Sequence, residues 1–506
     1  MKNPKISAIF DYVIEISGQA NYAQNQSFLV PETNTKLMVI SATKNKAYCL
    51  ADKNLENIRT GMEVTPLAET STVKTPNNIY GKILNINNEI LFGANEPFNN
   101  FYKSEHSIFN SKNTLLDYEP LTEQLNTGYI LIDLLIPIGK GQRELIIGDR
   151  KTGKTHIALN TIINQKGKNV KCIYVAIGQQ QTQIAAAYNL LKENGALDYT
   201  FIIDASSSNP YDQYLAPYIA MAHAENISME DDVLIVFDNL TNHANVVREL
   251  ALLINKPVGK EAFPGDMFYT HSRLLERSGK FKNRKSITAL PIIQTVENDI
   301  TSLVASNVIS ITDGQIVTNS ELFASGKIPA IDVELSVSRI GGNVQKPYIA
   351  KVASEVAKIY KTYKRQIKLA ALKYDLNAET NALINNGAMI EKMFIQKGVS
   401  AYTEKAMVLT SKITSWGILN GVTDIALAMK FIDLFIHKNE IAHQTFENIL
   451  NSNLKDEELA KNFFAFALQE FAKLNNLDWK IKLEGEFVPF NKAEMTQISQ
   501  QVMEAK

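Results

Sequence analysis

The chain has 506 residues, of which 45% are hydrophobic and 21% charged, and its formal net charge at pH 7 is −1. These values are ordinary for a soluble globular protein, and the length predicts roughly two or three domains rather than a single core. A charge balance this close to neutral gives no general case for nucleic-acid binding, which usually requires a basic surface, so no nucleic-acid partner is expected.

The first 69 residues predict a small β-barrel domain. The N-terminal sequence MKNPKISAIFDY lacks the apolar core of a signal peptide, and no apolar run in the chain approaches membrane-spanning length. We therefore expect a cytoplasmic protein. Short β-rich runs separated by polar turns, a spacing typical of small barrels, occur at Ser7–Phe10, Tyr12–Ile16, Lys36–Ser41 and Ala47–Leu50.

Residues 70–345 predict a second domain, of the α/β class. From about Gln142, apolar strands alternate with helical stretches, which indicates a mostly parallel sheet buried on both faces. The strands are predicted at Glu144–Ile147, Cys172–Ile177, Phe201–Asp204, Val233–Phe237, Ser286–Ile293 and Val308–Thr312. Cys172 lies inside such an apolar run and is far from the only other cysteine, Cys49, so no disulfide is expected.

A phosphate-binding loop is the most informative motif of the chain. Residues 148–155 read GDRKTGKT, a complete G-x-x-x-x-G-K-[ST] pattern between the apolar run Leu145–Ile147 and a helical stretch. Backbone N–H groups of such a loop close around phosphate oxygens, and the helix N-terminus adds partial positive charge. The predicted nucleotide-binding residues here are Gly148, Asp149, Arg150, Lys151, Thr152, Gly153, Lys154 and Thr155.

Two further strand ends predict the rest of the nucleotide site. Val233–Phe237 is followed by Asp238, and a carboxylate at that place can hold Mg²⁺ together with the Thr155 hydroxyl. Hydrolysis also needs a group that takes a proton from the attacking water, but Cys172–Ile177 is followed by Gly178 and Gln179. An amide cannot accept that proton, which indicates a site that binds ATP without turnover. The nearby acids, Glu193 and Glu225, are predicted to lie on helix surfaces.

Residues 346–474 predict a third domain, which is α-helical. Apolar residues recur at three- and four-residue steps from Val352 to Ile367 and indicate one long amphipathic helix. Further helical patterns occur at Met407–Leu419, Asp424–His437 and Glu457–Leu474. Residues 475–506 are a predicted C-terminal extension, polar except for a β-like patch at Leu483–Pro489, that forms a tail or a partner contact.

With these motifs in place, the chain resembles the alpha subunit of F-type rotary ATPases from about Glu119 to Leu474. The matching stretches are Pro137–Gly139, Gly141–Arg150, Tyr174–Gln179, Gly259–Tyr269, His271–Arg277, Asn307–Gln315 and Leu335–Gly341. The Asp-Arg pair after the first glycine of the phosphate loop is typical of alpha and not of the catalytic beta subunit. Alpha, and not beta, is therefore the match.

The resemblance implies a multidomain architecture with an N-terminal β-barrel crown, a central RecA-like P-loop domain and a C-terminal helical domain. It implies a hexameric ring in which alpha-type and beta-type subunits alternate around a gamma-type central shaft, on the inner face of the cell membrane. Such an alpha-type subunit binds ATP or ADP with Mg²⁺ and is itself non-catalytic, in a complex that hydrolyses or synthesises ATP.

Residue by residue, the resemblance gives Arg150–Thr155 to the phosphates and gives Thr155 and Asp238 to Mg²⁺. Gln179 takes the place of the catalytic glutamate of beta. Arg339, in the sequence SVSR, matches the arginine finger that alpha inserts into the neighbouring beta site. A guanidinium there supplies fixed positive charge to the transferring phosphoryl group.

Several features depart from the family pattern. The chain starts almost at the barrel, without the helical extension that contacts the peripheral stalk, and its tail continues beyond the usual alpha terminus. Near the nucleotide, Ile328-Pro329 replaces Arg-Pro, Asn239 replaces a second acid, and the adenine-side loop is shortened at Leu372–Asp375. These departures suit the F-type-like ATPase paralogues of wall-less bacteria. That group includes a gliding-motor form, which implies additional membrane or cytoskeletal partners and a role in motility.

Three other interpretations remain open at this point. The chain could be the alpha subunit of a conventional proton-translocating ATP synthase. It could be a self-sufficient RecA-like hexameric translocase, which would need its own catalytic glutamate and, for RNA, a basic or aromatic surface. It could also be a structural ring member in which the nucleotide only stabilises the fold, although such a subunit has no need of Arg339.

Overall fold

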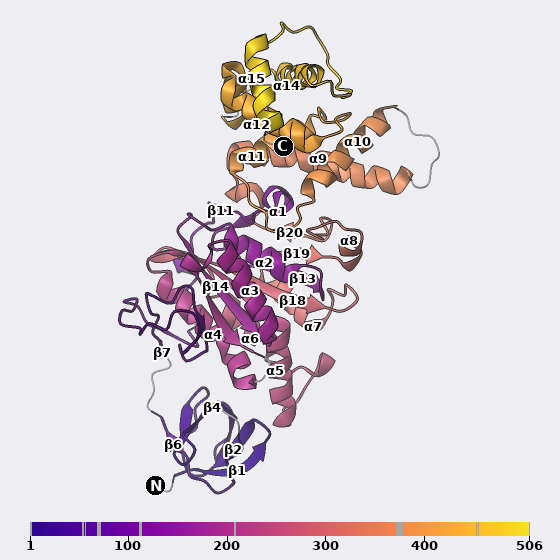
Figure 1. Ribbon diagram of the computed structural model, residues 1–506. Coiled ribbons are helices and arrows are strands. Elements are labelled where there is room, and N and C mark those ends of the chain that lie inside the picture. The colour runs from indigo at the N-terminus through magenta and orange to yellow at the C-terminus, as the bar shows by residue number, and fades with distance from the viewer. Residues whose placement is uncertain are drawn as a thin grey trace. The chain divides into compact units, whose positions relative to one another are not determined.

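The computed structural model describes residues 3–504 apart from residues 53–54, 56, 68–71, 111–113, 207–208, 371–377, 452 and 454 (Figure 1). The chain forms two compact units. The first comprises Met1–Thr127, Ile138–Gly326 and Ala330–Ile340, and the second comprises Gly128–Pro137, Lys327–Pro329 and Gly341–Lys506. The sheet-rich N-terminal region, the central nucleotide-binding domain and the helical C-terminal region predicted from the sequence are thus confirmed, whereas the exact domain boundaries stay predictions.

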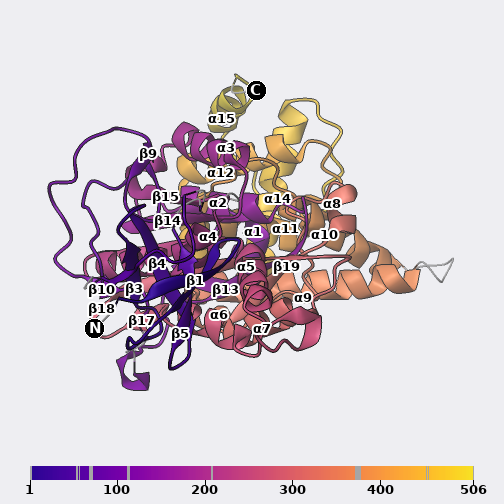
Figure 2. The same cartoon turned by 90° about the horizontal axis from the view of Figure 1, so that it is seen from below.

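An antiparallel sheet built from the N-terminal residues curls and closes on itself (Figure 2). The strand at one edge of this sheet pairs with the residues that precede the strand at the other edge. Lys5 forms an antiparallel β-bridge with Glu63, and the Ile6 amide N–H donates to the Met62 carbonyl at 2.9 Å. Alternate residues such as Ile14, Ile16 and Cys49 point inward and are fully buried. In spatial order the strands are β1 (Lys5–Phe10), β2 (Val13–Ser17), β5 (Lys46–Ala51), β4 (Thr35–Ala42), β3 (Ser27–Val30) and β6 (Thr65–Pro66).

The larger sheet of the first unit carries the nucleotide-site motifs. Its central strands are parallel and apolar on both faces, because helices cover both sides. In spatial order the strands are β20 (Val337–Ser338), β19 (Gly314–Thr318), β13 (Glu144–Asp149), β18 (Arg284–Thr295), β16 (Asp232–Asp238), β14 (Val170–Ile177), β15 (Thr200–Ala205), β8 (Ile83–Leu84) and β9 (Ile90–Phe92), with β17 (Gly279–Phe281) beside β18.

The helices of the first unit follow the strands in sequence, as expected for α/β units. They are α2 (Lys154–Ile163), α3 (Gln181–Glu193), α4 (Pro210–Ile227), α5 (Leu240–Leu253), α6 (Met267–Leu275), α7 (Leu303–Ile311) and α8 (Ser320–Ala324). Short strand pairs join β7 (Thr72–Val73) to β10 (His106–Ser107) and β11 (Gln124–Leu125) to β12 (Ile138–Gly139).

Two local predictions for the first unit are wrong. The predicted strand Val308–Thr312 is instead the end of α7, and the strand β19 begins only at Gly314. Buried Val304 and Val308 are spaced as on a helix, but a five-residue apolar window could not show that. Glu225 does not lie on a helix surface. It is fully buried on α4, where Arg277 and Arg284 pair with it at 2.6 and 3.5 Å.

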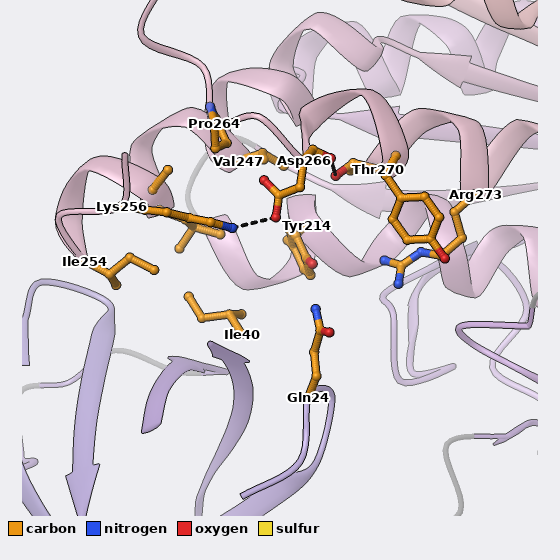
Figure 3. Close-up of a pocket in the computed structure, with 13 residues that line it drawn as sticks. Gln24, Ile40, Tyr214, Val247, Ile254, Lys256, Pro264, Asp266, Thr270 and Arg273 are labelled. Carbon is orange, nitrogen blue, oxygen red and sulfur yellow. Dashed lines mark hydrogen bonds and ion pairs between the residues drawn. The ribbon is translucent and has the colours of Figure 1, made fainter. Parts of the chain in front are cut away.

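The barrel and the large sheet share one apolar core. Val13, Met38 and Leu50 of the barrel belong to the same buried cluster as the strands and helices of the nucleotide-binding region. A cavity of about 80 Å³ remains where the barrel meets α5 and α6 (Figure 3). Gln24 of the barrel points toward it from one side, and the ion pair of Lys256 with Asp266, at 2.5 Å, lies on the other.

The second unit is built from helices. They are α1 (Ile130–Leu135), α9 (Pro347–Ala370), α10 (Ala378–Phe394), α11 (Glu404–Ser415), α12 (Ile425–Lys438), α13 (Glu440–Leu450), α14 (Glu457–Leu474) and α15 (Lys492–Glu504). The long amphipathic helix predicted after residue 345 is confirmed as α9, which packs on α10 and α11. Among the helices in the described part of the chain, none is long and apolar enough to cross a membrane.

The C-terminal extension folds back onto α12 and α14 of the second unit, to which it also belongs (Figure 1). The β-like patch predicted at Leu483–Pro489 forms no strand, and the helix α15 that follows it was not predicted. Phe487 stacks on Phe466 of α14, and Phe490 contacts Phe435 of α12. Phe487 of this patch and Phe490, which follows it, therefore cover a helical surface.

Candidate nucleotide-binding site

The backbone of the phosphate loop requires its two glycines. Gly148, the second-last residue of β13, has φ of +153°, and a Cβ there would lie 2.1 Å from the Thr318 hydroxyl oxygen. Gly153 has φ of +91° and is the N-cap of α2, so the helix that follows points its free N–H groups into the loop. Phosphate oxygens are the natural ligands for such N–H groups.

Lys154 and Thr152 hold the loop closed from inside. The Thr152 hydroxyl donates to the Asp149 carbonyl at 2.8 Å and lies 2.7 Å from the Thr318 hydroxyl. The Lys154 ammonium donates to the same Asp149 carbonyl and is only 8% exposed. Burial lowers the pKa of Lys154 to about 8. A bound anion next to this ammonium would relieve the cost of burying it, which is the electrostatic condition for phosphate binding.

Asp238 stands at the end of β16, directly beside the loop. Its carboxylate accepts hydrogen bonds from the Thr155 hydroxyl at 2.7 Å, the Tyr174 hydroxyl at 2.8 Å and the Gln179 amide at 3.1 Å. Burial raises its pKa, and the hydrogen bonds from Thr155 and Tyr174 oppose that shift. The structure thus brings together two predicted Mg²⁺ ligands, Thr155 and Asp238.

This oxygen set fits Mg²⁺ bound with a nucleotide. Within the described residues there is no group of three or more His, Cys, Asp or Glu side chains that could hold a metal ion. Mg²⁺ in nucleotide sites uses one or two protein oxygens and takes its other ligands from phosphates and water. A hydroxyl and a carboxylate 2.7 Å apart meet that requirement without a further acid.

Gln179 lies at the end of β14 with its amide turned toward Asp238. Its Nε2 donates to the Asp238 carboxylate at 3.1 Å and to the Asp238 carbonyl at 3.3 Å. Asn239, which replaces a second acid, is the N-cap of α5, and its side chain accepts the Asn242 amide N–H at 2.9 Å. The two positions that would supply further acids next to Asp238 therefore carry amides.

Asp149 and Arg150 have side-chain partners that the sequence analysis did not predict. The Asp149 carboxylate accepts from the Thr295 hydroxyl at 2.6 Å and from the Asn298 amide N–H at 2.9 Å. Arg150 donates through Nε to the Gln294 side chain at 3.3 Å. Gln294 and Thr295 are the last residues of β18, the neighbour of β13 in the sheet, and Asn298 lies in the loop that follows. The Asp149 side chain thus braces a neighbouring loop.

Arg339 lies at the other end of the sheet from the phosphate loop of its own chain. The strand register places Glu144, Gly314 and Ser338 at one level, and Arg339 follows Ser338. Gly148 is four residues further along β13, which corresponds to about 13 Å. Arg339 is exposed, and its guanidinium donates to the Thr312 and Ile309 carbonyls at 3.1 and 3.3 Å. These carbonyls belong to the C-terminal turn of α7, where a cation is favoured.

The adenine side of the predicted site is described only in part. Leu372–Asp375, predicted to be a shortened loop there, lies outside the described residues. In the second unit the Ile328 carbonyl accepts the Gln396 amide N–H at 2.7 Å, so this segment is tied to the residues that follow α10. The predicted loss of base contacts stays a prediction.

A glycine-rich loop between a parallel strand and a helix, with Asp238 on a nearby strand, defines a P-loop nucleotide-binding protein. Residues 128–338 match the ATP synthase alpha/beta family, nucleotide-binding domain. The chain is 41% identical over 498 residues to ATP synthase subunit alpha 2 of Mycoplasmopsis pulmonis, and the aligned region covers 96% of this chain and 97% of that protein. It therefore belongs to the alpha-subunit family of F-type ATPases, as its motifs predicted.

Other relatives carry the same kind of name. Identity to ATP synthase subunit alpha 1 of Mycoplasmopsis pulmonis is 42% over 387 residues, which is 75% of this chain and 72% of that protein. Identity to ATP synthase subunit alpha of Wigglesworthia glossinidia brevipalpis is 39% over 426 residues, which is 80% of this chain and 82% of that protein. The similarity to the alpha 2 protein thus covers more of the chain than either of these.

Proposed function

We propose that this chain is a non-catalytic, ATP-binding alpha-type subunit of a hexameric rotary ATPase, and that it lends Arg339 to a beta-type catalytic partner. Beta-type subunits alternate with it in the ring, and a gamma-type subunit forms the central shaft. The observation that carries the proposal is the Gln179 amide, which donates to Asp238 where hydrolysis would require a carboxylate.

In this proposal the loop residues Arg150–Thr155 surround the phosphates of ATP or ADP. Lys154 would reach the β- and γ-phosphates, and Thr155 and Asp238 would hold Mg²⁺. Mg²⁺, when bound, neutralises charge on the phosphate oxygens. Tyr174 and Gln179 keep the Asp238 carboxylate in place through hydrogen bonds of 2.8 and 3.1 Å. Gln179 can orient a water but cannot take its proton, so bound ATP persists.

Arg339 acts in trans in this proposal. The support is its position, since it is exposed at the end of the sheet that lies away from its own phosphate loop. In the isolated chain the carbonyls at the end of α7 hold its guanidinium. Moving from those neutral acceptors to the phosphate oxygens of a neighbouring site would exchange weak hydrogen bonds for charge-assisted ones.

Steady-state hydrolysis of Mg-ATP tests this division of labour. We expect the purified chain alone to show no measurable turnover, and the chain mixed with its beta-type partner to hydrolyse ATP. The partner alone is the matched control, because it would lack the finger. Robust turnover by this chain alone would mean that it carries its own general base, and the assignment of Gln179 would have to be abandoned.

We further propose that the complex is a specialised F-type-like ATPase at the inner face of the membrane, with additional membrane or cytoskeletal partners and a link to motility. The support is the nearly full-length similarity to the alpha 2 protein of a bacterium that also has an alpha 1 protein. Affinity purification of the chain from its cells tests this. Recovery with a regular peripheral stalk and a proton-channel ring would indicate a conventional ATP synthase instead.

A further inference from the structure

The backbone that carries Arg339, the proposed arginine finger, lies near Glu144, the first residue of β13. Because β19 pairs with both β13 and β20, Glu144 and Ser338 are each aligned with Gly314. A Cβ on Gly314 would lie 2.3 Å from the Glu144 carboxyl oxygen Oε2. Because Gly314 has no side chain, the Glu144 side chain can occupy this space. Ser338, the residue before Arg339, lies on the next strand, β20.

Gln142 connects Glu144 to Ser338. Its Nε2 donates to Glu144 Oε2 at 2.7 Å and to the Ser338 hydroxyl at 3.1 Å. Its own Oε1 accepts the Gly139 amide N–H at 2.7 Å, which fixes the orientation of the amide. Gln142 and Glu144 are both fully buried. The three side chains form a continuous hydrogen-bonded path to the residue next to Arg339.

The buried Glu144 carboxyl group lowers the stability of the fold. Its second oxygen, Oε1, is buried without a hydrogen-bond partner in the described part of the chain. A buried polar atom without a partner destabilises the fold, and such groups call for a functional explanation. Burial raises the pKa of Glu144 well above its ordinary value, whereas Gln142 and Arg339 lower it. The nearby Asp313 carboxylate acts with burial and also raises the pKa of Glu144.

The backbone of Arg339 is fixed from its other side by a separate set of contacts. Arg143 forms a two-pronged ion pair with Asp313, at 2.7 and 3.0 Å, and the Asp313 carbonyl accepts the Arg339 amide N–H at 2.8 Å. Three consecutive residues, Gln142 to Glu144, which lead into β13, therefore hold both sides of the backbone from which the guanidinium extends.

We propose that Glu144 is a positioning residue for Arg339: it holds Gln142, Gln142 holds Ser338, and the guanidinium is thereby aimed at the neighbouring subunit. The inference rests on the proposed function of Arg339 in trans. Catalytic groups lose rate steeply when they are displaced by about 1 Å. Loss of this path should therefore reduce the rate at the partner's site while leaving nucleotide binding by this chain intact.

A double-mutant cycle in the complex with the beta-type partner tests the proposal. Glu144→Met keeps the volume and removes the acceptor for Gln142, and we expect kcat for Mg-ATP hydrolysis to fall roughly ten- to hundredfold with KM nearly unchanged. Ser338→Ala breaks the same path at an edge strand, where the core is undisturbed, and should also lower kcat. Glu144→Gln keeps an acceptor for Gln142 and should restore most of the rate.

In an Arg339→Ala background, Glu144→Met should cause no further loss, because a residue that acts through Arg339 has nothing left to position. Thr200→Val, a fully buried change at the start of β15 across the sheet, is the matched control and should leave kcat unchanged. If Glu144→Met lowers kcat equally in both backgrounds, or in neither, the proposal for Glu144 is wrong, and the assignment of Arg339 as the finger is unaffected. A normal rate in Arg339→Ala itself would instead reject the function on which the proposal rests.

Discussion

Two lysines of the phosphate loop differ in burial and should differ in function. Lys154 is buried at the base of the loop, whereas Lys151 is exposed. We expect Lys154→Ala to weaken Mg-ATP binding by at least about tenfold, because an ion pair with phosphate is lost. Lys151→Ala is the matched control: it keeps the backbone N–H of the loop and removes only an exposed side-chain charge, so it should change the affinity by less than about twofold. Calorimetric titration of both variants measures this, and equal affinities for them would contradict the loop geometry.

At Gln179 the structure predicts an effect on stability that depends on Mg²⁺. Gln179→Glu would place a second carboxylate where the amide now donates to Asp238 at 3.1 Å. Repulsion between two nearby carboxylates should lower the free energy of unfolding by about 1–3 kcal/mol without metal. Mg²⁺ should restore much of that loss. Thermal unfolding with and without Mg²⁺ measures it, and a variant as stable as the wild type in the absence of metal would argue against this contact.

The residues of the candidate nucleotide site could be picked out from the sequence because they are local in it, and their role as ligands stays a prediction. Residues 148–155 form one uninterrupted motif, and Asp238 follows an apolar strand. The partners of Asp149 could not be predicted, because Thr295 is 146 residues away and meets it only through the pairing of β13 with β18. Glu225 was misplaced for a similar reason, since its two arginines come from distant segments.

At the scale of single elements, the C-terminal extension contributes to the stability of the second unit. Phe490 contacts Phe435, Phe463 and Phe466, while Val488 is 87% exposed. We expect Phe490→Ala to lower the free energy of unfolding by roughly 1–3 kcal/mol through lost aromatic packing. Val488→Ala should be neutral. Urea unfolding followed by tryptophan fluorescence compares them, and equal effects would mean that the extension does not pack as described.

Buried histidines on three helices predict how stability depends on pH. His223 on α4, His243 on α5 and His271 on α6 are fully buried, and burial lowers the pKa of His223 to about 3 and of His243 to about 4. As the pH falls below about 6.5, the unfolded chain binds protons that the folded chain cannot, so stability is lost. Each histidine should contribute about 1.4 kcal/mol per pH unit until its folded pKa is reached.

His223→Gln isolates one of these contributions. Glutamine can keep a hydrogen bond to the Thr75 hydroxyl, which lies 2.8 Å from the His223 ring nitrogen. Between pH 6 and pH 5 the variant should lose about 1.4 kcal/mol less stability than the wild type. Urea unfolding at both pH values gives the difference. The same pH dependence in both proteins would show that His223 is not buried in its neutral form.

The sequence predicted long periodic elements well and short ambiguous ones poorly. The amphipathic stripe from Val352 to Ile367 identified α9, because it repeats over several helical turns. Val308–Thr312 was misread because β-branched residues at the end of a helix look like a strand in a short window. Helix α15 was not predicted. It packs on α12 and α14, and the sequence alone does not show that these three helices come together.

At the scale of the whole molecule, the large sheet separates two proposed tasks. The carboxyl ends of β13, β14 and β16 carry the phosphate loop, Gln179 and Asp238, and the start of β13 supports the backbone of Arg339. In the proposed function, a site without a general base and an arginine that acts on a neighbouring site require an assembly. The isolated chain is therefore expected to bind nucleotide and to depend on a neighbour for turnover.

The rate of Mg-ATP hydrolysis by the complex carrying Arg339→Ala tests this account most directly. Assembly with the beta-type partner and nucleotide binding by this chain should remain close to wild type, because Arg339 is exposed and its guanidinium donates to carbonyl oxygens of its own chain, away from the phosphate loop. The account predicts that kcat falls by roughly a thousandfold or more. An unchanged kcat in a fully assembled complex would contradict it.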